Sequence, residues 1–562
     1  MKLLVSLFFI QTTVLFNCIQ FLVCTDNYST EVVKTDKGFV QGKILNTAGK
    51  SIRYSSFLGI PYAKPPIGYR RFKPPEEADA WTGIYQATLE KEKCPQKNPV
   101  DGFPMGKEDC LHLNVYSPKV DSNDTQLRPV MVWIYGGGFS SGSNSPDTYG
   151  SDFLIEEDVV VVAMNYRLGA LGFLSLNHTN ATGNAGLKDQ NLALKWVQKN
   201  IKNFGGDPKK VTIFGQSAGS ASTLYHVLSD QSKGLFRSVI AMSGSPLNRW
   251  GFTNLPEAVS RSFAIGRRMG IVTTNATFLL QKLYNATADH IVLATTSLTN
   301  NSPEPYMMPT IENPKIATAP ILTECWINKF KTGNFNHVPI MLGFVNVETL
   351  LYVGTNVVSR EGIIDATIKS VMKFPELLHT EEIKYLTNLK NSSGNNVNLP
   401  IGDQYQISWT SSDILFNYGI DRTQRFLAAA KSTPVYYYRN SFDYNQSLHR
   451  IWGVNLNGTS HADDIAQIFW LPKNNQSLDP QSDIGIQRSK TVRMWTNFAK
   501  YSNPTPNGTS DPLLKITWPP SGPNGLCLEI NRHAIVGPRP INKFLDYVEK
   551  VMESSLNEVN GC

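Results

Sequence analysis

The sequence predicts an α/β fold with a large, mostly parallel central sheet, helices on both faces and a helical insertion. From about residue 130 to 245, short apolar runs alternate with segments of helical spacing, which is typical of parallel strands joined by crossover helices. Strand-like runs also lie on both sides of a mostly helical stretch between about residues 250 and 430. We therefore interpret that stretch as an insertion within one domain.

The individual elements follow from residue type and spacing. Strands are predicted at 130–135, 159–164, 211–214, 239–242, 338–342 and 435–438. The run at 159–164 is apolar without interruption, which predicts a strand buried on both faces. Between the second and third strands, apolar residues recur at helical spacing, at Leu187, Leu194, Val197, Ile201 and Phe204. Gly205 and Gly206 are predicted to end this helix.

Composition excludes several classes of protein. The chain has 562 residues, of which 41% are hydrophobic and 18% charged, so it has too little charge and too much core material for a disordered scaffold. The net charge is +7 and no run of five basic residues occurs, which predicts no nucleic-acid partner. Seven cysteines are too few for a disulfide-dense scaffold.

The first residues predict secretion. Residues 1–24 combine a basic start at Lys2 with an apolar stretch, which predicts a cleaved signal peptide followed by one domain over 25–562. The alternative, a signal anchor, is weakened by the polar residues within the stretch, and no other segment is apolar enough to span a membrane. Asn-x-Ser/Thr acceptors support the secretory route, unless they merely reflect an asparagine-rich chain: Asn27, Asn123, Asn177, Asn180, Asn275, Asn285, Asn300, Asn391, Asn445, Asn457, Asn475 and Asn507.

A candidate nucleophile follows the strand predicted at 211–214. Gly215-Gln216-Ser217-Ala218-Gly219 joins that strand to a helix, as the Gly-x-Ser-x-Gly elbow requires, so that Ser217 would sit exposed on a strained turn at a helix N-terminus. The stretch 138–142 also matches the pattern around Ser140, but it leads into a polar segment with a proline instead of a helix. Ser217 is therefore the predicted nucleophile.

The glycines after the strand at 130–135 predict an oxyanion hole. Backbone N–H groups of Gly137, Gly138 and Ala218 are the expected donors to a developing negative charge, each worth ~3 kcal/mol. The alternative is a plain glycine turn between a strand and a loop.

A serine nucleophile needs a base and an orienting acid, in the chain order serine, acid, histidine. His461 lies in a loop of small residues after the last predicted strand, whereas His449 and His533 each stand beside an arginine and are predicted at the solvated surface. Glu348 follows the strand predicted to end near residue 342, although composition alone leaves other carboxylates open. This chemistry requires no metal and no cofactor.

Several long motifs, spread over nearly the whole chain after residue 24, occur in the same order as in a known protein family. They are the stretches 57–63 (FLGIPYA), 108–116 (EDCLHLNVY), 165–169 (NYRLG), 186–190 (GLKDQ) and 203–208 (NFGGDP), which leads to the elbow. With them the chain resembles the type-B carboxylesterases, the cholinesterase-like branch of the α/β-hydrolases. The resemblance implies Ser217 as nucleophile, His461 as general base and acid, and Glu348 as its orienting partner. Thr349 replaces the usual glycine after the acid, and Gln216 replaces a common glutamate, which should weaken any preference for cationic substrates.

The resemblance also implies structural pairs: the ion pairs Arg71–Glu108 and Arg167–Asp189 and the disulfide Cys94–Cys110. The loop 95–109 contains no tryptophan to stack on choline, which argues against an acetylcholine esterase. Cys325, Cys527 and Cys562 stay unassigned, and Cys562 is a candidate tether for a homodimer. Trp250 is a candidate wall of the substrate pocket, with ordinary core packing as the alternative.

The expected activity is hydrolysis of small apolar carboxylic esters through an acyl-enzyme, by a secreted protein. The elbow glutamine and the loop after the base resemble insect-type carboxylesterases, including juvenile-hormone-esterase-like members, so a juvenile-hormone-specific esterase is one alternative. A non-catalytic adhesion protein or a carrier on the same fold is the alternative from another class.

Overall fold

The computed structural model describes residues 29–98, 101–120, 126–299, 305–353, 360–392, 399–431 and 433–554. Its centre is an 11-stranded sheet with the strand order β18-β17-β16-β15-β14-β13-β9-β10-β8-β4-β3. The strands are β3 (Lys43–Asn46), β4 (Arg53–Pro61), β8 (His112–Ser117), β9 (Arg128–Ile134), β10 (Val160–Met164), β13 (Gly206–Gln216), β14 (Ser238–Met242), β15 (Ile340–Val345), β16 (Val435–Asn440), β17 (Cys527–Ile530) and β18 (Ile535–Gly537).

The sheet is parallel in its middle and antiparallel at both ends. All neighbours from β10 through β9, β13, β14, β15 and β16 to β17 pair in parallel. The pairs β8–β10, β4–β8, β3–β4 and β17–β18 are antiparallel. Every residue of β10 and β15 is buried, because helices cover both faces of a parallel sheet. The predicted fold class is confirmed.

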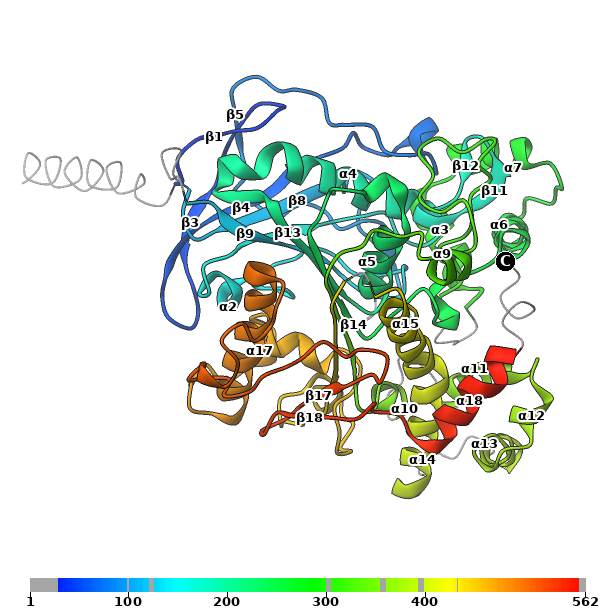
Figure 1. The fold of residues 1–562 in the computed structure, drawn as a ribbon. Helices are drawn as coiled ribbons and strands as arrows, with labels where there is room; N and C mark the ends of the chain where they lie inside the picture. Colours follow the sequence, from blue (N-terminus) through cyan, green and yellow to red (C-terminus); the bar gives the residue numbers. More distant parts are fainter. Residues whose placement is uncertain are drawn as a thin grey trace, which may run out of the picture.

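Helices flank the sheet on two sides. Figure 1 shows the sheet running between α17 on one side and α4 and α5 on the other. The helices are α2 (Asp152–Ile155), α3 (Gly169–Phe173), α4 (Ala185–Asn200), α5 (Ala218–Leu228), α6 (Leu255–Arg268), α7 (Ala276–Asn285), α8 (Ala288–Thr296), α9 (Trp326–Thr332), α10 (Leu350–Val353), α11 (Arg360–Val371), α12 (Pro375–Leu378), α13 (Glu381–Ser392), α14 (Ile401–Ser412), α15 (Tyr418–Ala429), α16 (Leu448–Ile451), α17 (Asp483–Tyr501) and α18 (Lys543–Ser554). Three small sheets hold β1 (Val33–Lys34), β2 (Phe39–Gln41) and β5 (Ile84–Gln86); β6 (Gln96–Lys97) and β7 (Pro104–Met105); and β11 (Ser175–His178) and β12 (Ala181–Thr182).

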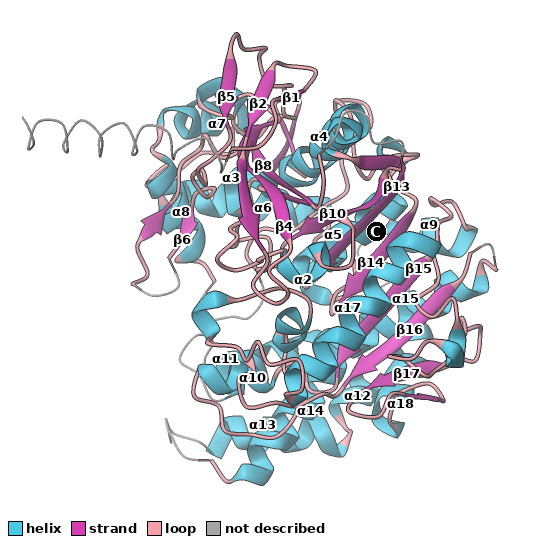
Figure 2. Ribbon diagram, turned by 90° about the vertical axis from the view of Figure 1, so that its left-hand side faces the viewer, coloured by secondary structure: helices cyan, strands magenta, loops and turns pink. Residues whose placement is uncertain are grey.

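The predicted helix after residue 185 ends as expected, with a 3-10 turn (Ile201–Phe204) and Gly205 at a φ of 82°. The mostly helical stretch is divided by β15 into two segments, one with α6 to α9 and one with α10 to α15. Figure 2 shows α10, α11, α13 and α14 gathered at one end of the molecule. Both segments return to neighbouring strands of the same sheet, which brings their loops to one edge.

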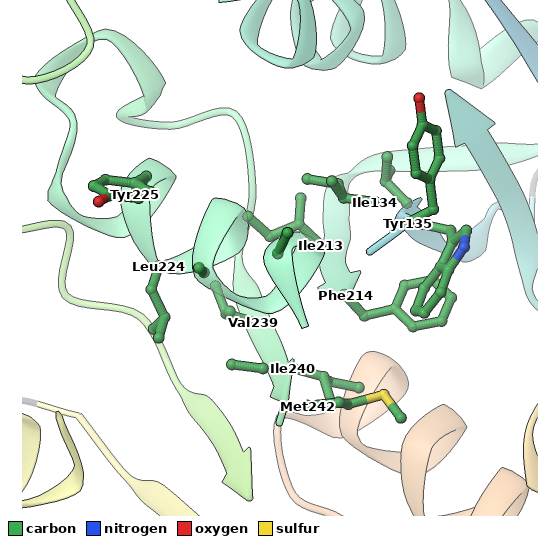
Figure 3. Close-up of a cluster of buried hydrophobic side chains, with 14 of the residues drawn as sticks. Ile134, Tyr135, Ile213, Phe214, Leu224, Tyr225, Val239, Ile240 and Met242 are labelled. Atoms are coloured by element: carbon green, nitrogen blue, oxygen red, sulfur yellow. The ribbon is translucent and has the colours of Figure 1, made fainter. Parts of the chain in front are cut away.

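A cluster of buried apolar side chains surrounds the point where β13 passes into α5. Figure 3 shows Ile134, Ile213 and Val239 of three neighbouring strands beside Leu224 and Tyr225 of α5. All five side chains are fully buried. Burying each one stabilises the fold by ~2 kcal/mol, so the end of β13 is held rigidly.

The disulfide and both ion pairs implied by the resemblance are present. Cys94 and Cys110 are bonded, Arg71 lies 2.6 Å from Glu108, and Arg167 forms a buried pair with Asp189 at 2.6 Å. Of the unassigned cysteines, Cys325 is disulfide-bonded, Cys527 is a buried free thiol, and Cys562 lies outside the described residues. In the part of the chain that the structure describes, no helix has both the length and the apolar character needed to cross a membrane.

Candidate active site

Ser217 occupies a strained turn between β13 and α5. Its backbone adopts φ 59° and ψ −125°, a conformation that costs a residue with a side chain ~1–3 kcal/mol. The Ser217 N–H donates to the carbonyl of Met242 at 2.8 Å, which ties the turn to β14. Because the turn is fixed between two packed elements, the serine side chain is held at the end of the sheet, 8% exposed.

The flanking glycines are required by close packing. A Cβ on Gly215 would lie 2.6 Å from the carbonyl oxygen of Ile134, and a Cβ on Gly219 would lie closer still to that same atom. No side chain fits at such distances, because the backbone of β9 cannot retreat from the middle of the sheet. The elbow therefore has the geometry that its sequence pattern predicted.

The glycine-rich loop after β9 lies against the serine. A Cβ on Gly136 would come within 2.9 Å of the Ser217 Cβ. Gly137 and Gly138 have φ values of 106° and 59°, and within the described residues their N–H groups donate to no protein acceptor. The N–H of Ala218, the first residue of α5, also has no partner within its own helix. Ser140, by contrast, lies in an exposed turn that no helix follows.

His461 and Glu348 form a buried pair. Nδ1 of His461 donates to Oε2 of Glu348 at 2.6 Å, and the backbone N–H of His461 donates to the Glu348 carbonyl at 3.1 Å. The other carboxyl oxygen of Glu348 accepts from the N–H of Val345, at the end of β15. The loop after β15 thus presents the carboxylate to the imidazole, and the carboxylate cannot turn away without also losing its bond from Val345.

The far nitrogen of His461 faces the residue before the serine. Its Nε2 lies 3.1 Å from the side-chain Nε2 of Gln216. Since Nδ1 holds the proton shared with Glu348, the neutral ring accepts at Nε2, and the Gln216 amide donates there. Among the described residues, no hydrogen bond joins this nitrogen to the hydroxyl of Ser217.

Aromatic side chains enclose the pair. The ring of Phe416, in a π-helical segment (Asp413–Asn417) between α14 and α15, lies 4.8 Å from the His461 ring. Trp250 packs at 5.4 Å against Phe416 and donates from Nε1 to the carbonyl of Leu415 at 2.9 Å. A Cβ on Gly244 would touch both Trp250 and the Ser217 carbonyl, so the structure brings Trp250 next to the elbow.

Thr349 forms hydrogen bonds to two residues of α14. It is fully buried, its hydroxyl donates to the Ser408 carbonyl at 2.8 Å, and its N–H donates to Oγ of Ser412 at 3.0 Å. The position that departs from the family pattern thus ties the loop of Glu348 to a helix.

The predicted surface position of His449 is wrong, and the sequence did not point to Asp464 as part of the site. His449 is completely buried and pairs with Asp463, although its neighbour Arg450 indicated a surface position. His533 is exposed, as predicted. Asp464 is buried, and no other residue in the described part of the chain hydrogen-bonds to either of its carboxyl oxygens. Burial raises its pKa to about 8, with the nearby charge of Glu348 as the second cause. No sequence signal marks this carboxyl, since nothing distinguishes it from its neighbour in the chain.

Comparison with known proteins identifies the class to which this fold and site belong. The model of the carboxylesterase family matches residues 29–543. The chain therefore belongs to the carboxylesterase family, and it is a carboxylic ester hydrolase on the α/β-hydrolase fold.

Particular relatives are esterases of two kinds. The chain is 34% identical to a juvenile hormone esterase of Tribolium castaneum, over 88% of this chain and 87% of that one, and 30% identical to one of Heliothis virescens, over 85% and 86%. It is also 34% identical to an acetylcholinesterase of Danio rerio, over 87% and 82%. The crystal structure of juvenile hormone esterase from Manduca sexta with OTFP covalently attached matches with a TM-score of 0.80 and 28% identity, over 94% of this chain and 99% of that one.

Proposed function

We propose that the protein is a secreted serine esterase that hydrolyses small apolar carboxylic esters through an acyl-enzyme. The observation that carries this proposal is the position of His461, whose ring lies between the carboxylate of Glu348 and the elbow of Ser217. The unused N–H groups of Gly137 and Gly138 support an oxyanion hole beside the same serine.

Acylation begins with a change of partner at His461. When an ester enters, the Gln216 amide gives up Nε2, and this nitrogen takes the proton of the Ser217 hydroxyl as its oxygen bonds to the ester carbonyl carbon. The carbonyl oxygen becomes an oxyanion that accepts from Gly137, Gly138 and Ala218. His461 then protonates the leaving alcohol, and the bond between the carbonyl carbon and the alcohol oxygen breaks.

Deacylation repeats the sequence with water. His461 removes a proton from the attacking water, the second oxyanion forms in the same hole, and the bond to Ser217 breaks as the serine regains its proton. Glu348 stays ionised throughout and stabilises the imidazolium that forms twice in each cycle. These steps need neither a metal nor a cofactor.

The surroundings favour an apolar, uncharged substrate. Trp250 and Phe416 supply aromatic walls, Gln216 is neutral, and the disulfide loop 95–109 has no tryptophan to hold a quaternary ammonium. The juvenile hormone esterase relatives support the alternative of a juvenile-hormone-specific enzyme. A profile of kcat/KM over esters of increasing chain length, including juvenile hormone, separates a general from a dedicated esterase, because a dedicated pocket rejects the simple esters.

The rival from another class is a non-catalytic adhesion protein or a carrier. Such a protein has no use for a buried carboxylate that orients a histidine beside a strained serine, because burial and strain both cost stability. The complete set Ser217, His461 and Glu348 therefore favours catalysis.

Secretion is supported by two features of the described residues. The disulfide Cys94–Cys110 is typical of an oxidising compartment. Most acceptor asparagines in the described residues are exposed: Asn177, Asn275, Asn285, Asn391, Asn445, Asn457, Asn475 and Asn507; Asn180 is half-buried, and Asn27, Asn123 and Asn300 lie outside the described residues, as does the signal peptide predicted at 1–24. Expression in a eukaryotic host, with glycosidase treatment and N-terminal sequencing of the secreted chain, tests both predictions.

The extent of the central sheet supports the proposed domain organisation. One sheet takes strands from Lys43 to Gly537, which supports a single domain over 25–562. A homodimer through Cys562 and the lack of a nucleic-acid partner stay predictions.

The acyl-enzyme is tested by trapping it. Rapid mixing with excess p-nitrophenyl ester should release a burst of about one p-nitrophenol per active site, and mass spectrometry after an acid quench should find the acyl group on the peptide with Ser217. Ser140→Ala is the matched control and should give the same burst. An acyl group elsewhere, or none at any quench time while turnover proceeds, would overturn the mechanism.

A further inference from the structure

A second histidine–carboxylate pair lies directly behind the base. His449, in α16, and Asp463, two residues after His461, are both completely buried. Nδ1 of His449 lies 2.6 Å from Oδ2 of Asp463. The proposed catalytic steps use neither residue.

Asp463 fastens the loop on both sides of His461. Its Oδ2 accepts from the backbone N–H of Ser460 at 2.6 Å, and its Oδ1 accepts from the N–H of His449 at 3.1 Å. The Asp463 carbonyl accepts from the hydroxyl of Tyr444 at 2.9 Å. The Asp463 carboxylate thus holds the residue before the base, and His449 holds this carboxylate in turn.

The hydrogen-bond partners of His449 define its charge. Its Nε2 lies 3.0 Å from the carbonyl of Leu456, which can only accept, so Nε2 carries a proton. Asp463 accepts from two backbone N–H groups, which favours its ionised form. Nδ1 lies 2.6 Å from Asp463 Oδ2 and 3.1 Å from Ser447 Oγ, so it donates to the nearer carboxylate and also carries a proton. His449 is therefore an imidazolium, paired with a carboxylate and shielded from water.

The positive charge on His449 compensates a negative charge close to His461. Three carboxyls, Glu348, Asp463 and Asp464, crowd around the loop of the base, and each is fully buried. His449 compensates Asp463, whereas no other described residue hydrogen-bonds to the Asp464 carboxyl. Further charged or titratable groups near this pair are Tyr444, which donates to the Asp463 carbonyl, and Asp443 and Arg488, which act on Tyr444. Arg450, next to His449 in the chain, pairs with Asp443. Without the charge on His449, Asp463 would add an unbalanced negative charge beside the base.

We propose that His449 is a positioning residue for the esterase reaction: through Asp463 it fixes the loop of His461 so that the base meets Glu348 and Ser217. The inference rests on the proposed function, because it assigns His461 its role as base. A displaced loop would leave substrate binding almost intact and slow the steps in which His461 transfers protons.

The test compares His449→Gln with His533→Gln, a matched substitution at an exposed histidine. Active sites are counted by titration with a covalent organophosphate, and kcat and KM are measured with p-nitrophenyl butyrate. For His449→Gln we expect kcat per titrated site to fall about 100-fold with KM changed less than about threefold, and for His533→Gln no change. Asp463→Asn should give a similar loss, and the double variant should lose little more than either single variant, since the two residues act as one unit.

A pH profile separates positioning from mere stability. Loss of the imidazolium leaves Asp463 uncompensated, so the acid limb of kcat/KM in His449→Gln should move to higher pH, because the added negative charge favours protonated His461. An unchanged kcat and an unchanged limb in folded His449→Gln would overturn the proposal. The Ser217→Ala variant of the otherwise unaltered protein tests the proposed function separately. If it is inactive, the result for His449→Gln decides the role of His449; if it stays active, the proposed function itself fails.

A measurement on the unaltered protein covers the case in which His449→Gln does not fold. NMR of the full chain labelled with 15N-histidine should show, at pH 8, one ring with protons on both nitrogens. If every ring is neutral at that pH, His449 is not an imidazolium and the proposal is wrong.

Discussion

The side-chain amide of Gln216 donates to Nε2 of His461 at 3.1 Å, on the side of the ring opposite Glu348. The His461 ring is therefore held from both sides. In the proposed mechanism the Ser217 hydroxyl must take the same nitrogen, so Gln216 competes with Ser217 for it. The residue before the proposed nucleophile thus contacts the proposed base, a relationship that the elbow motif does not express.

Gln216→Glu should move the pH dependence of the reaction. A carboxylate at this distance favours the imidazolium form of His461, so the acid limb of kcat/KM should move to higher pH, by about 1 pH unit or more. The ratio of kcat/KM for acetylthiocholine over a neutral thioester should rise. Gln216→Met, which removes the donor without adding charge, is the control. An acid limb of kcat/KM that stays in place in Gln216→Glu, or moves to lower pH, would contradict the contact between residue 216 and His461.

Glu348→Gln should lower kcat by about 10⁴-fold, because the amide can donate to Nδ1 and select the wrong tautomer of His461. Its KM should change little. Steady-state kinetics after active-site titration measure the effect, and a melting curve checks the fold. A rate near that of the unaltered enzyme would mean that another carboxylate orients the base.

Asp464→Asn should remove a pH-dependent loss of stability. The pKa of Asp464 is raised to about 8 in the fold, above the ~3.9 of an unfolded chain, so the folded state holds a proton that the unfolded state has lost. The contribution of this group is fully present below pH ~4 and is lost as pH rises to about 8, by up to ~1.4 kcal/mol per pH unit. Urea unfolding at pH 5, 6, 7 and 8 should therefore show a growing advantage for Asp464→Asn. Parallel stability curves for the two proteins would count against the unpartnered carboxyl.

Cys94→Ser with Cys110→Ser should destabilise the fold by about 3 kcal/mol, the chain-entropy value for a separation of 16 residues. Gln96 within that loop bonds both backbone groups of Gly142, so the glycine-rich loop after β9 loses a fixed neighbour as well. Chemical denaturation measures the loss. Cys527→Ala, at a buried free thiol, should cost only about 1 kcal/mol. Equal costs for the two changes would mean that the crosslink contributes little.

The parts of this protein that sequence predicts are those in which local chemistry decides the structure. The run at 159–164 is apolar and mostly β-branched, which predicts the buried strand found at Val160–Met164. Gly215 and Gly219 are predicted by the sharp turn from strand to helix, which leaves no room for a Cβ at either position. The burial of His449 could not be predicted in this way, because it depends on contacts with Asp463 and Leu456 that form only in the folded chain. The partner of Gln216 likewise lies 245 residues away. Contacts of that range are set by the whole sheet, and neither spacing nor residue type reveals them.

The central claim, that Ser217 is the nucleophile, is tested most directly by the hydrolysis of p-nitrophenyl acetate by Ser217→Ala and by Ser140→Ala, each purified and shown to be folded. The two serines share the Gly-x-Ser-x-Gly pattern, so the comparison isolates the elbow. We expect Ser140→Ala to keep the rate of the unaltered enzyme and Ser217→Ala to lose on the order of 10⁶-fold in kcat. Equal rates for Ser217→Ala and the unaltered enzyme would contradict the account.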